Sequence, residues 1–348
     1  MKPRILVTGG AGYIGSHTVV ELANAGYEPI ILDDLCNSSR FALKGIEKIL
    51  GYLPEFHKID LLDYPNLESY LKTADIQGTI HFAAYKAVGE SVMNPLKYYR
   101  NNLDSLINLL YLLKERSKNF IFSSSCTVYG QPDHLPVTED SEFKKAESPY
   151  GFTKQVCERI LSDTVLAEKY NVIALRYFNP VGAHPTHFIG ELPLGVPQNL
   201  VPFITQAAIG KRDSLTVFGN DYPTPDGSCI RDYIHVVDVA KAHVKALERL
   251  MGFTPEKQEK GNYEFYNLGT GKGNSVLEVI HAFEKVNKVK LPYHIGPRRS
   301  GDVIQIWGDV KKSQEGLHWV AERDLNDMME TAWNWEKYLQ MHAHEIQD

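Results

Sequence analysis

Residues 4–15 of the chain read RILVTGGAGYIG, and this stretch decides the fold. A short apolar run ends at Thr8 and is followed at once by Gly9, Gly12 and Gly15, which are spaced three residues apart. This spacing is typical of a strand, a tight turn and a helix whose backbone approaches a dinucleotide pyrophosphate closely. The N–H groups and the positive dipole end of such a helix attract the phosphates. The stretch therefore predicts the first βα unit of a dinucleotide-binding domain.

An acidic residue ends the second apolar run, where a ribose would be bound. Asp33 stands 18 residues after Gly15, and its carboxylate can accept hydrogen bonds from both ribose hydroxyls of an adenosine. The additional phosphate of NADP would face this carboxylate with like charge, so the motif predicts NAD. A second glycine-rich stretch, residues 269–273, lacks the first glycine and the final Ser or Thr of a P-loop. We predict that it is a turn before a helix capped by Ser275.

Outward from the first motif, short β-branched runs alternate with longer segments of helical periodicity. The predicted strands are Arg4–Thr8, Glu28–Asp33, Glu55–Ile59, Gly78–Ala83, Asn119–Ser125 and Asn171–Phe178. The predicted helices between them include Gly15–Ala25, Pro95–Lys114 and Pro149–Tyr170. This alternation is typical of right-handed βαβ units and predicts an α/β fold with a doubly wound, parallel Rossmann sheet of six strands.

The alternation ends after Phe178, where prolines become frequent, as is typical of a transition between domains. The remainder predicts four helices, Leu200–Gly210, Val236–Leu250, Ser275–Asn287 and Asp324–Met341, and short strands at Thr216–Phe218 and Tyr293–Ile295. We predict a dinucleotide-binding domain in residues 1–178 and a smaller C-terminal α+β substrate domain in residues 179–348. Part of residues 232–268 is expected to pack back on the first domain.

Composition excludes several classes of protein. The 348 residues carry 37 Lys and Arg against 43 Asp and Glu, a net charge of −6 with no basic block, so we expect neither nucleic acid nor a membrane as a partner. At 43% hydrophobic and 23% charged residues, the composition is that of a globular protein. Four widely spaced cysteines and no long apolar window predict reduced thiols and a cytoplasmic location. The histidines form no H-E-x-x-H motif, and we expect no metal site.

Three residues at the end of the fifth strand and the start of the next helix predict catalysis. Tyr150 and Lys154 form a Y-x-x-x-K pair, which places both side chains on one helix face. A tyrosine base requires a pKa about three units below its usual value of about 10, and a buried ammonium together with a positive nicotinamide ring can lower it. Ser125 ends a strand at the edge where α/β folds bind ligands. We predict Tyr150 as base, Lys154 as the residue that lowers its pKa, and Ser125 as proton relay in hydride abstraction from a carbinol carbon.

The chain resembles the UDP-glucose 4-epimerases of the extended short-chain dehydrogenase/reductase family over nearly its full length. The resemblance is carried by VTGGAGYIGSHT from Val7, HFAAYKAVGESV from His81, FSSSCTVYG from Phe122, SPYGFTK from Ser148, RYFNPVGAH from Arg176, FGNDYPTPDGSCIRDYIHVVDVA from Phe218 and RRSGDV from Arg298. It implies that UDP-glucose and UDP-galactose are interconverted in galactose metabolism. Tyr150 would remove the 4-OH proton while bound NAD accepts the C4 hydride, and the 4-keto sugar would rotate before the hydride returns. It also implies a homodimer formed through Pro95–Lys114 and Pro149–Tyr170.

The resemblance implies two sets of binding residues. The cofactor contacts would be Gly9, Gly12, Tyr13, Ile14, Gly15, Asp33, Asp34, Leu35, Cys36, Asn37, Ser38, Asp60, Leu61, Phe82, Ala83, Ala84, Lys86, Asn101, Ser125, Tyr150, Lys154 and Phe178. The contacts of the UDP-hexose substrate would be Ser125, Tyr150, Asn179, Asn199, Leu200, Thr216, Phe218, Arg231, Arg299, Asp302 and Ile306. Among these, Arg231 and Arg299 carry planar guanidinium groups suited to a diphosphate, and Asp302 can accept from the uridine ribose.

Two positions depart from the pattern of that family. Cys126 stands where alanine is usual, and we interpret it as a packing residue. Ile306 occupies a position that varies between a bulky Tyr and a small Cys or Ser, and the small residues are associated with N-acetylated sugars. Isoleucine is intermediate in size, so acceptance of UDP-N-acetylhexosamines stays open.

Three other functions fit the sequence less well. A nucleotide-sugar dehydratase would need an acid/base carboxylate pair after Ser125, where this chain has Cys126 and Thr127. An NAD-dependent sugar dehydrogenase or reductase would need exchangeable cofactor. A non-enzymatic NAD-binding scaffold would typically lack the Tyr or the Lys of the catalytic pair. Asp232 and His235 could also be mistaken for a catalytic pair, but a structural network is the better interpretation.

Overall fold

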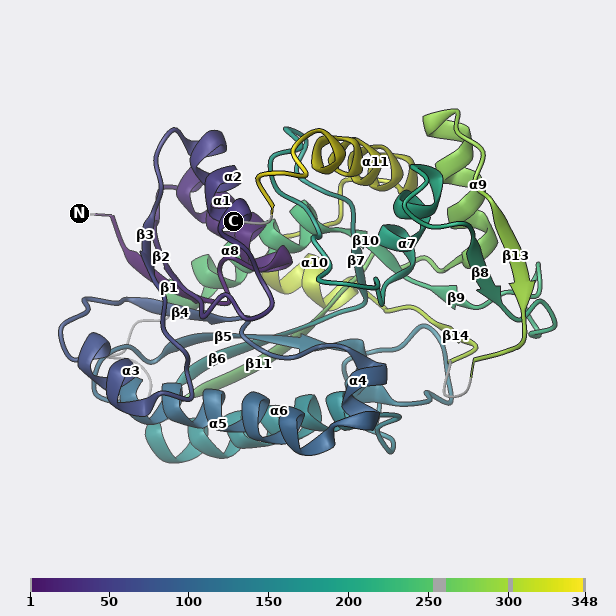
Figure 1. Ribbon diagram of the computed structural model, residues 1–348. Coiled ribbons are helices and arrows are strands. Elements are labelled where there is room, and N and C mark those ends of the chain that lie inside the picture. Colours follow the sequence, from purple (N-terminus) through teal and green to yellow (C-terminus); the bar gives the residue numbers. More distant parts are fainter. Residues whose placement is uncertain (1, 253–260, 300–302, 347–348) are drawn as a thin grey trace.

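The computed structural model describes residues 2–252, 261–299 and 303–346. Its centre is a seven-stranded parallel sheet with the order β11-β6-β5-β4-β1-β2-β3 (Figure 1). The strands are β1 (Arg4–Thr8), β2 (Glu28–Leu32), β3 (Glu55–His57), β4 (Gly78–His81), β5 (Asn119–Ser125), β6 (Asn171–Tyr177) and β11 (Asn262–Leu268). All neighbouring strands of this sheet run parallel, which confirms the predicted doubly wound fold.

The seventh strand, β11, is missing from the sequence prediction, which has six. It pairs along its whole length with β6, from Asn262 beside Asn171 to Leu268 beside Tyr177. Its sequence, NYEFYNL, mixes polar and aromatic residues, and only its last three residues are buried. An edge strand is half solvated, so it lacks the continuous apolar run by which a buried parallel strand is recognised.

Helices cover both faces of the sheet (Figure 1). One face carries α1 (Tyr13–Asn24), α2 (Arg40–Leu50) and α8 (Val236–Met251), and the other carries α3 (Tyr64–Leu71), α4 (Val88–Met93), α5 (Pro95–Leu113) and α6 (Pro149–Glu168). Successive residues of each strand enter opposite cores because strand side chains alternate. In β1, Ile5 and Val7 pack in the core under α1 and α8, whereas Leu6 packs in the core with α5 and α6.

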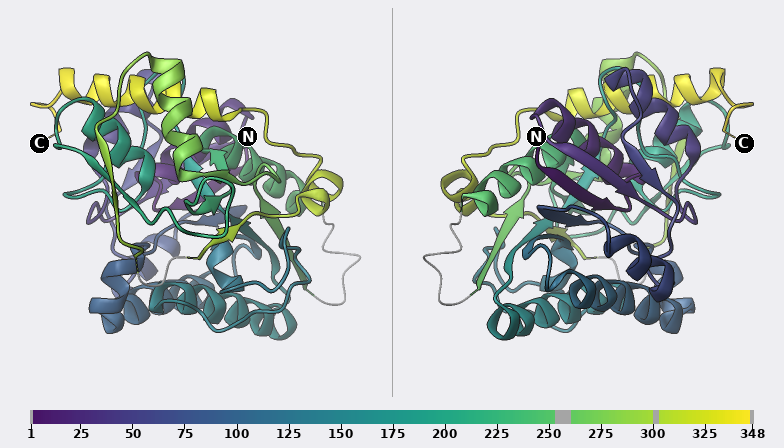
Figure 2. Two further views of the ribbon diagram at one scale, coloured as in Figure 1. Left: turned by 90° about the vertical axis from the view of Figure 1, so that its right-hand side faces the viewer. Right: turned by 90° about the vertical axis from the view of Figure 1, so that its left-hand side faces the viewer.

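A smaller α+β region, which includes α11 (Leu325–Met341), lies beside the sheet (Figure 2). Its helices are α7 (Leu200–Ala208), α9 (Val276–Asn287) and α11 (Leu325–Met341), while α10 (Lys311–Leu317) packs against β11 and α8. Short strands form three small sheets: β7 (Asn179–Val181) with β10 (Tyr233–His235), β8 (Leu215–Phe218) with β13 (Tyr293–Gly296), and β9 (Ile230–Arg231) between β12 (Asn274–Ser275) and β14 (Gln305–Ile306). Although α8 and β11 come after residue 178, they pack with the central sheet. The exact division into two domains stays a prediction.

Two buried histidines lie where α1, α8 and α11 meet. His17 of α1 is fully buried and shares a hydrogen bond of 2.7 Å with the carbonyl of Tyr13. His235 precedes α8 and accepts the Val237 N–H at 3.1 Å, while its Nε2 lies 3.1 Å from the hydroxyl of Thr331. Burial lowers the pKa of His17 to about 3 and that of His235 to about 2. Both side chains are therefore buried in the neutral form.

The fold is expected to lose stability as the pH falls below about 6.5, because unfolded histidines bind protons that the buried ones do not. The folded pKa values lie below the unfolded value, so this stabilisation is fully present above pH 6.5 and is lost on acidification. Each of these two histidines is expected to lower the free energy of unfolding at pH 5 by about 2 kcal/mol relative to pH 7. Replacing His17 with Gln should reduce the stability difference between the two pH values by that amount, as measured by chemical denaturation. The exposed His281 on α9 provides the control, since His281→Gln should leave the difference unchanged.

Candidate active site

The glycine motif forms the turn between β1 and α1, and its backbone leaves no room for side chains. Gly9 has a φ of +69°, a conformation that favours glycine. A Cβ atom on Gly15 would lie 2.2 Å from the carbonyl oxygen of Gly9, and one on Gly9 would lie 2.8 Å from the nitrogen of Ala83. Gly12, at the start of α1, offers no side-chain cap to the first N–H groups of the helix. A backbone this close, ending in uncapped N–H groups, fits a dinucleotide pyrophosphate.

Replacing Gly15 with Ala is expected to weaken dinucleotide binding at least about tenfold and to destabilise the fold by about 1–3 kcal/mol. The added methyl group would overlap the Gly9 carbonyl, so the turn must shift. Dinucleotide remaining after gel filtration and the thermal unfolding midpoint measure the two effects. Gly89→Ala is the matched control, because its Cβ would find its nearest neighbour at 3.9 Å. Equal effects from both substitutions would contradict the argument.

Asp33 connects the end of β2 to the glycine turn. One carboxylate oxygen accepts the Ala11 N–H at 3.0 Å, and the other accepts the Leu35 N–H at 2.9 Å and the Ser38 hydroxyl at 2.7 Å. Burial raises the pKa of Asp33, and these three hydrogen bonds act in the opposite direction. The carboxylate is thus held in place beside the turn, where an adenosine ribose would lie.

The other residues of the predicted cofactor set lie around the same edge of the sheet. The carboxyl ends of parallel strands share one edge, and β1 is the strand at which the strand order reverses. Residues beside these ends are Asp34 to Ser38 after β2, Asp60 and Leu61 after β3, Phe82 to Ala84 after β4, Ser125 at the end of β5 and Phe178 after β6; Tyr13 and Ile14 open α1. Lys86 lies further along the loop after β4, and Asn101 on α5 donates to Asn102 at 3.1 Å, which accepts the N–H of Tyr85 in that loop at 2.9 Å.

The predicted catalytic residues meet at the end of β5. Tyr150 and Lys154 stand on the first turns of α6, whose N-cap Ser148 accepts the Gly151 N–H at 3.1 Å. Lys154 is buried, and its ammonium donates to the carbonyl oxygen of Ser123 at 2.6 Å. The same ammonium lies 6.0 Å from the centre of the Tyr150 ring. The helix spacing thus brings the phenol and the ammonium to one side of the strand end.

Burial shifts the pKa values of Tyr150 and Lys154 in opposite directions, each toward the uncharged form of its group. Burial raises the pKa of Tyr150 to about 12, and a hydrogen bond with Ser125 acts in the opposite direction. Burial lowers the pKa of Lys154 to about 8, against the attraction of Cys157 and Glu158. Lys154 is not among the groups that shift the pKa of Tyr150, so the chain by itself does not produce the expected lowering of that pKa. The second expected source of lowering, the positive charge of a bound nicotinamide ring, lies outside the chain.

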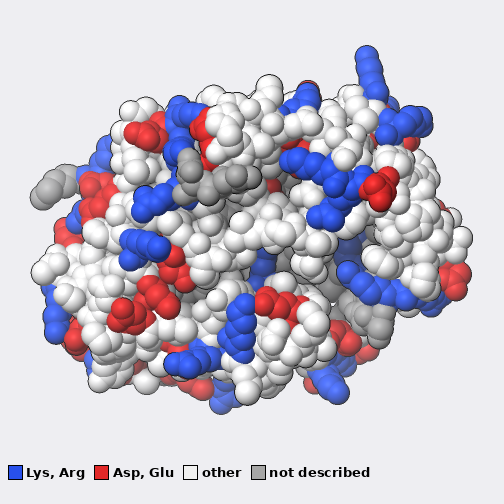
Figure 3. Space-filling model, in the orientation of Figure 1, with Lys and Arg blue, Asp and Glu red and all other residues white. Residues whose placement is uncertain are grey.

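The predicted substrate residues line the α+β region beside this cluster. Asn179 is in β7, and Asn199 and Leu200 begin α7. Arg231 of β9 stands beside Ile306 of β14, and Ile306 packs with Phe178 and Cys126. Thr216 lies 3.1 Å from Nε2 of His294, and the Arg299 guanidinium lies 5.6 Å from the centre of the Phe218 ring. Asp302 lies outside the described residues. The space-filling view in Figure 3 shows a hollow near the middle of the face that is turned to the viewer in Figure 1.

Asp232 and His235 have structural partners, as predicted. The Asp232 carboxylate accepts from the N–H and the hydroxyl of Thr270 at 2.8 and 2.7 Å and from the N–H groups of Gly271 and Gly308 at 3.2 and 3.4 Å. It therefore holds the turn at residues 269–273, where Gly271 has a φ of +74°. The helix that follows begins after Ser275, which forms a capping box with Glu278, so the predicted cap is confirmed.

The structure also adds residues that sequence reasoning missed. Glu158 and Arg176 form a buried ion pair at 2.6 Å, one helical turn beyond Lys154, and Glu158 accepts the hydroxyl of Ser124 at 2.5 Å. Glu191, in the loop before α7, contacts members of both predicted binding sets. Glu158 could have been noticed, because it stands four residues after Lys154 and therefore on the same face of the helix. Glu191 stands alone in a loop and has no comparable signal.

Within residues 2–252, 261–299 and 303–346, no group of three or more His, Cys, Asp or Glu side chains is arranged to hold a metal ion. None of the helices there combines the length and the apolar character needed to cross a membrane.

The sequence of this chain matches a known protein family. Residues 5–269 match the model of the NAD dependent epimerase/dehydratase family. The chain belongs to this family. One similar protein is the UDP-glucose 4-epimerase of Haemophilus influenzae. It is 50% identical over 335 residues, which are 96% of this chain and 97% of that protein.

Solved structures of family members are similar over the whole fold. The UDP-glucose 4-epimerase of Bifidobacterium longum, in complex with NAD+ and UDP, has a TM-score of 0.90 at 44% identity and covers 96% of this chain and 98% of its own. The enzyme of Stenotrophomonas maltophila, with bound NAD and formylated UDP-arabinopyranose, has a TM-score of 0.92 at 44% identity, covering 97% and 99% of the two chains. The likeness therefore spans both the central sheet and the α+β region.

Proposed function

We propose that this protein is an NAD-dependent epimerase that interconverts UDP-glucose and UDP-galactose. The observation that carries the proposal is the meeting of Tyr150, Lys154 and Ser125 at the end of β5, on the sheet edge that the glycine turn and Asp33 share. The likeness to UDP-glucose 4-epimerases at about half identity over nearly the whole chain supports the choice of substrate.

The chain's own residues divide the chemistry between them. NAD, when bound by the glycine turn, Asp33 and Lys86, supplies the acceptor of the C4 hydride. Tyr150 takes the proton of the 4-OH group, and Ser125, which hydrogen-bonds Tyr150, relays it. Lys154 is held by the carbonyl of Ser123 and keeps a positive charge near the phenol. Its pKa of about 8 leaves most of this charge in place at neutral pH.

Each face of the sugar must in turn be presented to the nicotinamide ring. The nucleotide must therefore be bound tightly, while the hexose must be free to rotate. Arg231 and Arg299 supply guanidinium groups for the diphosphate, and Asn199 and Leu200 stand at the N-terminal end of α7, where N–H groups favour phosphate. Ile306 borders the hexose side of the site with Phe178 and Cys126. Apolar walls make no directional bonds to the sugar, so the 4-keto intermediate can rotate about its link to the diphosphate.

The test is to mix the purified protein with UDP-galactose, add no cofactor, and follow the sugar by NMR. Formation of UDP-glucose without accumulation of NADH is the expected result. A 4-keto-6-deoxy product, or accumulation of NADH as the sugar is consumed, would contradict the proposal. The same assay with UDP-N-acetylgalactosamine determines whether Ile306 leaves room for the acetamido group.

Dehydratase activity, the other activity in the family name, is not expected. Elimination of water requires an acid and a base on the sugar, and the residues after Ser125 are Cys126 and Thr127. Burial raises the pKa of Cys126 to about 12, so its thiol does not act as an acid or base near neutral pH.

We further propose that two copies associate through α5 and α6 as a homodimer. These helices contact each other and lie on the side of the sheet away from α11 (Figure 2). Their outer faces expose large apolar side chains, namely Leu96, Ile107 and Tyr111 on α5 and Phe152 and Leu166 on α6. Such a face favours a partner of the same kind, because two copies cover each other.

Light scattering is expected to give the mass of a dimer, and the double substitution Ile107→Glu, Tyr111→Glu the mass of a monomer. The charges would be desolvated at the contact, which costs far more than the lost apolar area alone. The pair Gln340→Glu, Met341→Glu, at exposed positions at the end of α11 on the other side of the molecule, adds the same charge and serves as the control. A wild-type monomer would refute the dimer.

A cytoplasmic location is proposed on the state of the cysteines. Cys36, Cys126, Cys157 and Cys229 are all free thiols, and three of them are buried. Reduced thiols persist in reducing compartments. Fractionation of the source cells, with activity measured in each fraction, tests this location.

A further inference from the structure

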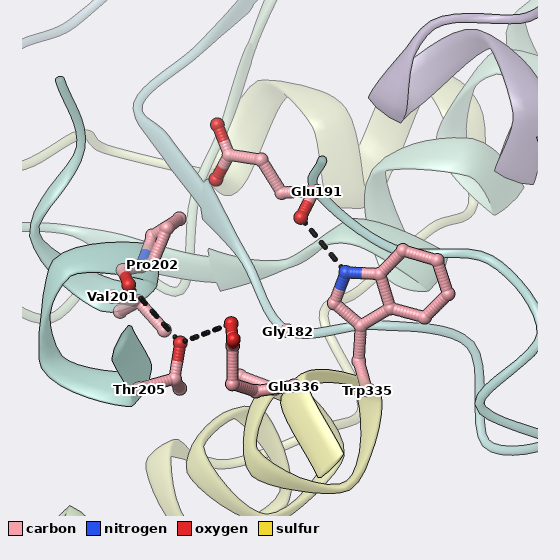
Figure 4. A pocket seen from close by; sticks show the side chains of 8 residues that line it. Gly182, Glu191, Val201, Pro202, Thr205, Trp335 and Glu336 are labelled. Carbon is pink, nitrogen blue, oxygen red and sulfur yellow. Dashed lines mark hydrogen bonds between the residues drawn. The ribbon is translucent and has the colours of Figure 1, made fainter. Parts of the chain in front are cut away.

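Glu191 lies in the loop between β7 and α7, and its backbone is firmly placed. Its carbonyl oxygen accepts the indole N–H of Trp335 on α11 at 2.8 Å (Figure 4). The preceding residue, Gly190, packs against the same indole, where a Cβ atom would lie 2.6 Å from ring carbons. Gly190 also pairs with Ala183, which closes the loop. The position of the Glu191 side chain is thus set by contacts with a helix at the far end of the chain.

The carboxylate of Glu191 joins two segments that are far apart in the sequence. The same oxygen accepts the Lys86 ammonium at 3.0 Å and the side-chain amide of Asn199 at 2.6 Å. Only 12% of the Glu191 side chain is exposed, so the ion pair is shielded from solvent on the carboxylate side. A charge-assisted contact in such a place is stronger than the same contact on an open surface.

Lys86 belongs to the cofactor edge of the sheet. It lies in the loop after β4, next to β1, and its ammonium is 5.9 Å from the ring centre of Tyr13. Tyr13 opens α1 within the glycine motif and donates its hydroxyl to the carbonyl of Gly182 at 2.6 Å. The loop that carries Glu191 therefore contacts both Lys86 and Tyr13 at the sheet edge where the cofactor is proposed to bind.

Asn199 belongs to the substrate side. It is the N-cap residue of α7, but its side chain makes no capping hydrogen bond and points to Glu191 instead. Asn is among the best N-cap residues, so this diversion leaves the first N–H groups of α7 without a side-chain partner. Glu191 thereby orients the start of α7 and keeps its N–H groups available.

We propose that Glu191 is a positioning residue that sets the geometry of both binding sites through one carboxylate. It holds the ammonium of Lys86 at the cofactor edge and the amide of Asn199 at the start of α7. The inference rests on the proposed function, in which Lys86 serves NAD and Asn199 serves the UDP-sugar. It predicts that one substitution, at a loop residue that belongs to neither predicted binding set, weakens the binding of both NAD and the UDP-sugar through separate contacts.

Glu191→Ala is expected to raise the Kd of UDP and to lower the affinity for NAD, each by about tenfold. UDP binding is measured by calorimetry, and NAD is quantified in the protein after gel filtration and denaturation. The KM for UDP-galactose should rise by the same factor, while kcat changes less than about threefold, because the residues at Tyr150 are untouched. Glu191→Gln keeps an oxygen acceptor for both donors and should recover most of both affinities. Glu330→Ala, at an exposed position on α11, is the control.

Double substitutions separate positioning from a general loss of structure. In a Lys86→Met background, Glu191→Ala should cause no further loss of NAD, and in an Asn199→Ala background no further loss of UDP affinity. Losses that add in both backgrounds, or a Glu191→Ala protein that binds both ligands normally, would overturn the inference. Both binding measurements are independent of turnover. An inactive wild-type protein would therefore refute the proposed function while the test of Glu191 still gives an answer.

Discussion

A Tyr150→Phe protein is expected to lose turnover by about two to four orders of magnitude while it still binds NAD and UDP. The substitution removes only the hydroxyl that accepts the 4-OH proton. The ring stays in place at the start of α6, where the Lys154 ammonium lies 6.0 Å from its centre. Turnover is measured by NMR of the sugar, and binding by calorimetry with UDP and by the NAD content of the purified protein.

The control for this experiment is Tyr52→Phe, because Tyr52 is an exposed tyrosine after α2. It should leave turnover unchanged. Unaltered turnover in the Tyr150→Phe protein would refute the assigned base, and a loss of NAD or UDP binding would mean that the hydroxyl holds the site together. The pH profile adds a second readout, because a base whose pKa burial raises to about 12 requires positive charge at the site to act near neutral pH.

The largest expected effect on stability is at the buried pair of Glu158 and Arg176. Glu158→Ala should reduce the free energy of unfolding by about 3–5 kcal/mol, since it leaves a buried guanidinium without its counter-charge. Both side chains are 4% exposed, and the Arg176 guanidinium lies 4.4 to 5.2 Å from the ring centres of Phe265, Phe143 and Tyr129. Solvent therefore cannot replace the lost carboxylate. Chemical denaturation measures the change.

A double substitution distinguishes the lost charge from lost packing. Glu158→Leu combined with Arg176→Met removes both charges and retains apolar bulk, and it should recover most of the loss. The exposed pair of Arg159 and Asp163 on the same helix serves as the control, because breaking a surface pair costs at most about 1 kcal/mol. If Glu158→Ala costs no more than Asp163→Ala, the buried pair is not a stabilising contact of this fold.

The placement of Tyr150, Lys154 and Ser125 at one sheet edge could be predicted because their relations are local. Tyr150 and Lys154 are one helical turn apart, and Ser125 ends a strand, so backbone geometry alone places them at one sheet edge. The glycine spacing is of the same kind, since Gly9, Gly12 and Gly15 form one turn within seven residues. The apolar runs of β1 to β6 were recognisable because buried parallel strands are apolar on both faces.

Two of the missed contacts of Glu191 reach residues far away in the sequence. Glu191 meets a lysine 105 residues away and a tryptophan 144 residues away, and no periodicity connects such positions. The edge strand β11 was missed for a related reason, because its half-solvated sequence becomes a strand only through pairing with β6. The electrostatics of Tyr150 likewise depend on burial by neighbours that the motif does not contain.

The sequence by itself determined the parallel sheet, the glycine turn and the order of Ser125, Tyr150 and Lys154, because each follows from residue spacing along a single strand, turn or helix. Only the tertiary structure decided that burial raises the pKa of Tyr150, that β11 completes the sheet, and that Glu191 links the cofactor edge to α7. These features depend on contacts between separate segments of the chain, such as β6 with β11 and Glu191 with Lys86. Packing, and with it the loss of solvent around charged groups, exists only in the folded chain.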